Sequence, residues 1–164
     1  MNPEEINFFK THLSEIRKYK KESDYELSNT LLVASNDFGI EHLDLILLAF
    51  DDESEDQSAI YSFRHSFADI YKKTDKETFF EVFLSNLSIL FPHAIGWART
   101  LFTQWTYNEP EGLLFVKIAR RYPDTKEKIL SVFDIILNER YDDGTESHDA
   151  ANVKKYKEIL LANS

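Results

Sequence analysis

Cysteine is absent from this chain of 164 residues, which excludes disulfides, thiol catalysis and every zinc site that needs sulfur. Only four glycines occur, and none belongs to a glycine-rich phosphate loop. No apolar run approaches the roughly 20 residues that span a bilayer, and the opening MNPEEINFFK does not resemble a signal peptide. We therefore expect a soluble, cytoplasmic protein that does not contact a membrane.

Catalytic and metal-binding patterns are also missing. None of the five histidines has the spacing of HExxH or of another metal-ligand motif. The acidic run DDESED lacks the glycine and the distal glutamate of an EF-hand loop. We interpret His65, beside Arg64, as a structural histidine hydrogen-bonded to a neighbouring helix, with a catalytic role as the alternative. A basic groove with interleaved aromatics, as nucleic-acid binding would need, is missing too. Taken together, these absences predict no enzyme, cofactor, metal site or nucleic-acid ligand.

Aromatic residues are plentiful, with 13 phenylalanines, 8 tyrosines and 2 tryptophans to build the core of one domain. Both tryptophans lie in the stretch from Asp51 to Asn108. Apolar residues there recur at three- and four-residue steps, which indicates helices with one buried face. The recurring positions are Ile60, Phe63, Phe67, Ile70 and Tyr71, then Phe79, Phe80, Phe83, Leu87 and Leu90, then Trp97, Leu101 and Trp105.

The same reasoning along the whole chain predicts an all-α fold. Pro92 should end the fifth helix, Asp124 should cap the eighth, and the very apolar third helix should lie near the centre of the packing. We expect a single domain (1–164) of eight or nine antiparallel helices in a HEAT-like or related superhelical stack, with a compact bundle as the alternative. The predicted helices cover about 3–21, 23–34, 40–50, 59–71, 75–91, 94–106, 109–121, 124–138 and 152–161, and the segment 141–152 is predicted to be a polar loop.

Negative charge is concentrated in one third of the chain. The net charge is −10, and the segment 24–69 alone holds eleven acidic residues against one basic residue, Arg64. Such a surface can simply keep the protein soluble, or it can steer a basic partner and repel nucleic acid. The candidate partner-binding residues are Asp37, Glu41, Asp44, Asp51, Asp52, Glu53, Glu55 and Asp56, with Tyr25 and Tyr61 as aromatic anchors.

Two stretches in the central region 43–110 carry a family resemblance. They are LLAFDDESEDQSAIYSFRHSF, with an acidic joint before a helix, and LFPHAIGWARTLFTQWTYNEP, with a proline-bounded turn before a tryptophan. Both resemble the helical bacterial immunity proteins of family thirty, which accompany polymorphic and contact-dependent growth inhibition toxins. The matching family positions would be Asp51, Asp52, His65, Trp97, Ala98, Arg99, Leu101 and Asn108.

The resemblance implies a protein that is not an enzyme and that neutralises one cognate toxin domain. We expect a monomer that forms a one-to-one heterodimer with the C-terminal domain of a toxin, an RNase or a DNase with a basic cleft. Two other hypotheses remain open. One is a HEAT-like adaptor or regulatory module without a toxin partner, and the other is a protein that mimics nucleic acid.

Overall fold

The computed structural model describes residues 1–139, 144–146 and 148–162, and it confirms the all-α prediction. Nine α-helices and three 3-10 turns are present in this described part. The α-helices are α1 (Pro3–Ile16), α2 (Glu22–Ser35), α3 (Leu43–Leu48), α4 (Gln57–Lys73), α5 (Lys76–Asn86), α6 (Ile95–Thr106), α7 (Glu109–Ala119), α8 (Lys126–Asn138) and α9 (Ala150–Leu161). The 3-10 turns are η1 (Ile40–His42), η2 (Leu87–Leu90) and η3 (Pro123–Thr125).

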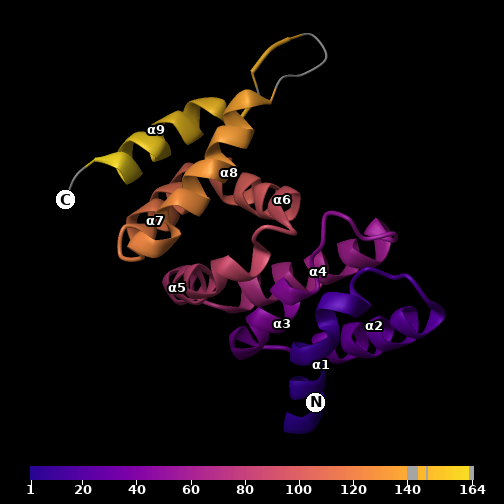
Figure 1. Cartoon of the computed structure of the whole chain (residues 1–164). Coiled ribbons are helices and arrows are strands. Elements are labelled where there is room, and N and C mark those ends of the chain that lie inside the picture. Colours follow the sequence, from indigo (N-terminus) through magenta and orange to yellow (C-terminus); the bar gives the residue numbers. More distant parts are fainter. Residues whose placement is uncertain (140–143, 147, 163–164) are drawn as a thin grey trace. The chain divides into compact units, whose positions relative to one another are not determined.

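These helices form two compact units, which are described separately. Unit 1 comprises Met1–Asp75 and Pro92–Ala94, and unit 2 comprises Lys76–Phe91 and Ile95–Ser164. In Figure 1, α1 to α4 of unit 1 are indigo to magenta, and α5 to α9 of unit 2 follow toward yellow.

The centre of unit 1 is α3, as predicted from its apolar composition. Its side chains Leu43, Leu45 and Ile46 are fully buried. This helix packs against α1 and α4, while α2 also packs against α1 and α4. Directly after α3, Phe50 makes an edge-to-face contact with Phe67 of α4.

Two ion pairs show that α1 and α3 run in the same direction. Lys10 Nζ lies 2.5 Å from Asp44 at the start of α3. Further along the chain, Arg17 donates to the carbonyl of Leu48 at 3.2 Å, at the end of α3, and pairs with the carboxylate of Asp51. The connecting helix α2 therefore runs back in the opposite direction. After α1 the chain turns at Tyr19, whose φ of 53° is left-handed and unusual for a residue other than glycine. Burial of the Tyr19 ring and a hydrogen bond between its hydroxyl and that of Ser28 hold this conformation.

Unit 2 is built around Trp105. Its indole is fully buried and lies against rings from three helices of the unit: Phe79, Phe80 and Phe83 of α5, Phe102 of α6 and Phe115 of α7. The prediction that both tryptophans are core residues is confirmed, since Trp97 is buried as well. Each edge-to-face aromatic pair adds about 0.5–1.5 kcal/mol beyond the burial of its area, so this cluster dominates the core of unit 2.

Some predicted boundaries were wrong. The fifth helix leaves α geometry at Asn86 and continues to Leu90 only as the 3-10 turn η2. Asp124 does not cap the eighth helix, because it lies inside η3 and Thr125 occupies the N-cap position. The last helix begins at Ala150, two residues earlier than predicted. Of the predicted polar loop 141–152, residues 141–143 and 147 lie outside the described residues, as does residue 140 before it.

Candidate partner-binding surface of unit 1

The acidic joint, defined here as residues 51–57 between α3 and the first turn of α4, is anchored by a buried ion pair. Arg17 Nε lies 2.9 Å from Asp51 Oδ2, and the two residues are only 8% and 3% exposed. The other carboxylate oxygen, Asp51 Oδ1, accepts the backbone N–H of Glu53 at 2.9 Å. Asp51 therefore holds the end of α1 and the first turn of the joint together from inside.

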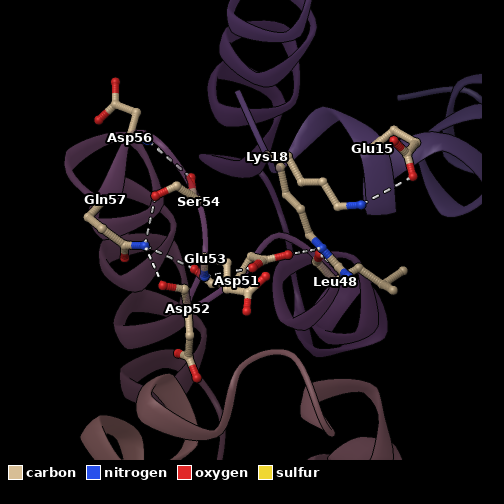
Figure 2. Close-up of polar contacts among 10 residues, drawn as sticks. Glu15, Lys18, Leu48, Asp51, Asp52, Glu53, Ser54, Asp56 and Gln57 are labelled. Atoms are coloured by element: carbon tan, nitrogen blue, oxygen red, sulfur yellow. Dashed lines mark hydrogen bonds and ion pairs between the residues drawn. The ribbon is translucent and has the colours of Figure 1, made fainter. Parts of the chain in front are cut away.

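Gln57 fixes the backbone of the joint from the other side. Its amide nitrogen lies 3.2 Å from each of three carbonyl oxygens, those of Asp51, Asp52 and Ser54, and Figure 2 shows these contacts fanning out from one side chain. The backbone N–H of Glu55 also donates to the carbonyl of Lys18 at 3.3 Å. The conformation of the joint is consequently set by hydrogen bonds along its whole length.

Asp56 completes the joint as the N-cap of α4. Its Oδ1 accepts the backbone N–H of Ala59 at 3.0 Å and the hydroxyl of Ser58 at 2.9 Å. These hydrogen bonds, the one from Ala59 first, lower the pKa of the Asp56 carboxyl because they favour its charged form. Asp56 thus stays ionised while it starts the helix.

His93 is a part of this site that sequence reasoning missed. Its carbonyl accepts the backbone N–H of Asp52 at 2.9 Å, and its Nε2 is buried without a hydrogen-bond partner among the described residues. Burial lowers the pKa of the His93 imidazole, the Arg17 cation lowers it further, and Asp51 and Asp52 oppose the shift. No local pattern marks this role, because His93 and the joint are far apart in the sequence and meet only in the folded unit.

The structure divides the eight predicted acidic residues by role. Asp51 is removed from the candidate surface: its carboxylate is buried and paired with Arg17, so a partner cannot reach it. Asp44 is half-buried and paired with Lys10. Lys10 and Arg17, the partners of Asp44 and Asp51, lie about 10 Å apart along the axis of α1, given a rise of 1.5 Å per residue. The exposed members are Asp37 and Glu41, between α2 and α3, and Asp52, Glu53 and Glu55 on the joint, with Asp56 half-buried beside them.

Both predicted aromatic anchors are exposed. Tyr25 is 38% exposed and makes an edge-to-face contact with Tyr19, at 5.0 Å between ring centroids. Tyr61 on α4 is 47% exposed, and its hydroxyl accepts a hydrogen bond from Arg64 at 3.0 Å. The Arg64 guanidinium also lies 5.1 Å from the centroid of the Tyr61 ring, a cation–π distance.

Next to the joint, an open hollow of about 420 Å³ lies along α4. It is lined by Gln57, Ser58, Tyr61, Ser62 and His65. His65 is exposed, with its ring edge-to-face against Tyr61 one turn earlier. The interpretation of His65 as a structural histidine hydrogen-bonded to a neighbouring helix was therefore wrong, since it is exposed and its ring contact is with Tyr61 of its own helix.

Among the described residues, no group of three or more histidine and carboxylate side chains is placed to hold a metal ion. Likewise, no described helix combines the length and apolar character needed to cross a bilayer. No family model, curated protein or solved structure matches the chain.

Proposed function

We propose that this chain is an immunity protein that binds a toxin domain through the acidic joint and neutralises it in the cytoplasm. The observation that carries the proposal is a joint that exposes Asp52, Glu53 and Glu55 while the buried Arg17–Asp51 pair holds its backbone in place. A surface that is ordered before binding loses little conformational entropy when a partner docks. The resemblance of residues 47–67 and 90–110 to immunity proteins supports the same function.

The charge of unit 1 favours a basic partner. Unit 1 has sixteen acidic and eight basic residues, a net charge of −8, which leaves −2 for unit 2. A field of this sign accelerates association with a basic surface such as the substrate cleft of an RNase or a DNase. Nanomolar affinity corresponds to about −12 kcal/mol, which an interface of about 1,600 Å² can provide when a few anchors are well buried. Tyr25 and Tyr61, on either side of the joint in the sequence, are the proposed anchors in a one-to-one complex.

The direct test is a titration of this chain with the toxin domain encoded immediately upstream, at low and at physiological salt. We expect nanomolar binding that weakens as salt rises. Replacing Asp52, Glu53 and Glu55 together by lysine should slow association about tenfold or more at low salt. The matched control replaces three exposed acidic residues of unit 2, Asp124, Glu127 and Glu158, by lysine and changes the net charge equally.

Two outcomes separate the parts of the proposal. If both triple variants slow association to the same extent, only the overall charge matters and the acidic joint is not the contact. If the wild-type chain does not bind the upstream domain at either salt concentration, the toxin partner is wrong. The second candidate, a helical adaptor or regulatory module, would then lead, and an apolar hollow between α1 and α2 of unit 1 favours it.

A further inference from the structure

The hollow between α1 and α2 is lined mainly by apolar side chains. Its volume is about 320 Å³, and Phe8, Phe9 and Leu27 line it together with Thr30, Glu4 and Glu5. Phe9 is buried, whereas Phe8 is 39% exposed although it stacks on His12 at 4.5 Å and meets Phe9 edge-to-face at 5.5 Å. The hollow thus contains a partly exposed phenylalanine ring, Phe8, that is held by ring contacts with His12 and Phe9.

Charge limits what can fill this hollow. Both ionisable residues that line it, Glu4 and Glu5, are acidic, and Glu5 is held in place because it accepts the backbone N–H of Asn2 at 2.8 Å. The nearest basic residue along α1, Lys10, pairs with Asp44 of α3. A partner that covers the apolar lining would therefore place its adjacent charge beside carboxylates, which favours a cation and disfavours an acid.

We propose that this hollow docks a segment of a partner protein in which a large apolar side chain stands next to a lysine or an arginine. The apolar side chain packs on Phe8, Phe9 and Leu27, and the cation pairs with Glu4 at the edge of the hollow. Burial of an exposed aromatic ring supplies the affinity, and the carboxylates supply the selection for a basic segment. The inference does not depend on a toxin partner, since none of the residues that line the hollow belongs to the acidic joint.

The test uses the full chain and a defined probe, a synthetic amphipathic helical peptide of leucine and lysine. Titration of the isotope-labelled chain, followed by NMR, should give saturable shifts at the amides of residues 4–9 and 27–30. Phe8→Ala and Leu27→Ser should each raise Kd at least about fivefold, the equivalent of about 1 kcal/mol. Glu4→Lys should raise Kd at low salt and have less effect at high salt.

Matched variants make the result decisive. Tyr107→Ala removes a ring that is 72% exposed in unit 2 and should leave Kd unchanged. The triple lysine variant of the acidic joint should keep its peptide binding, even if it loses binding to a toxin domain. Shifts confined to residues 52–57, or an unchanged Kd for a folded Phe8→Ala variant, would overturn the assignment of the hollow. A folded state is established in each case by far-UV circular dichroism.

Discussion

Removal of the Asp51 carboxylate should destabilise unit 1 more than the place of Asp51 in the acidic run DDESED would indicate. In Asp51→Ala, the Arg17 guanidinium stays buried without its carboxylate, and the backbone N–H of Glu53 loses its acceptor. Breaking a buried ion pair from one side costs about 3–5 kcal/mol, because an uncompensated charge remains in a poorly solvated position. Whole domains are stable by only about 5–15 kcal/mol, so this loss should be large for unit 1.

Two further variants separate the effect of the buried charges of Arg17 and Asp51 from the effect of the hydrogen bond to Glu53. Asp51→Asn keeps an oxygen that can accept the Glu53 N–H, so its cost should fall below that of Asp51→Ala. The double variant Arg17→Met with Asp51→Leu removes both charges and should recover most of the stability, because well-packed apolar pairs often replace buried ion pairs without loss. Because that variant also lacks the hydrogen bond to Glu53, the joint should be less ordered and bind a basic partner more weakly.

The assay must report on unit 1, and tryptophan fluorescence does not, because Trp97 and Trp105 both belong to unit 2. Hydrogen exchange read by mass spectrometry on peptides from residues 1–75, in increasing urea, gives the local free energy of opening. We expect Asp51→Ala to lower protection in α1, α3 and the joint. A loss below about 1 kcal/mol, with protection of the joint unchanged, would refute the view that the Arg17–Asp51 pair organises this surface.

Three other perturbations have defined expectations. The pKa of His93 lies below its ordinary value of 6.5, so the unfolded chain gains a proton first as pH falls. The contribution of neutral His93 to the unfolding free energy is therefore complete above pH 6.5 and is lost as the pH falls below it. The His93→Gln variant should make the unfolding free energy depend less on pH between pH 7 and 5. An unchanged pH dependence in this variant would contradict the expectation. In Gly112→Ala of α7, the added Cβ would lie 2.6 Å from Cε2 of buried Tyr156. Urea unfolding should therefore show a free energy of unfolding about 1–3 kcal/mol lower, in spite of the better helix propensity of alanine. A higher free energy of unfolding would mean that the Tyr156 ring shifts freely. Trp105→Ala should cost unit 2 about 3–5 kcal/mol by the same measurement, and a cost near zero would contradict its central place among the rings.

The helices could be predicted from sequence because the signals that form them are local. Ile60, Phe63, Phe67 and Ile70 recur at helical spacing, and all four are buried on one face of α4. Proline restricts the residue before it, but α5 already ends at Asn86, so Pro92 does not set the end of that helix as predicted. The helix boundaries were predicted less well, because α-helical and 3-10 geometry differ little in energy at helix ends. The turn η2 extends α5 with the hydrogen bonds of the tighter 3-10 helix, and η3 places Asp124 inside a turn.

The candidate site could be predicted only in part. The sequence alone determined the helical fold class and the excess of acidic residues in one third of the chain, because helical periodicity and charge are readable residue by residue. Only the tertiary structure decided which acids are structural. Asp51 and Asp52 are adjacent and chemically alike, but Arg17 lies 34 residues from Asp51 in the sequence and is brought to it by the parallel packing of α1 and α3. The role of His93 beside the joint has the same origin, since contacts between distant segments depend on how helices pack and leave no periodic trace in the chain.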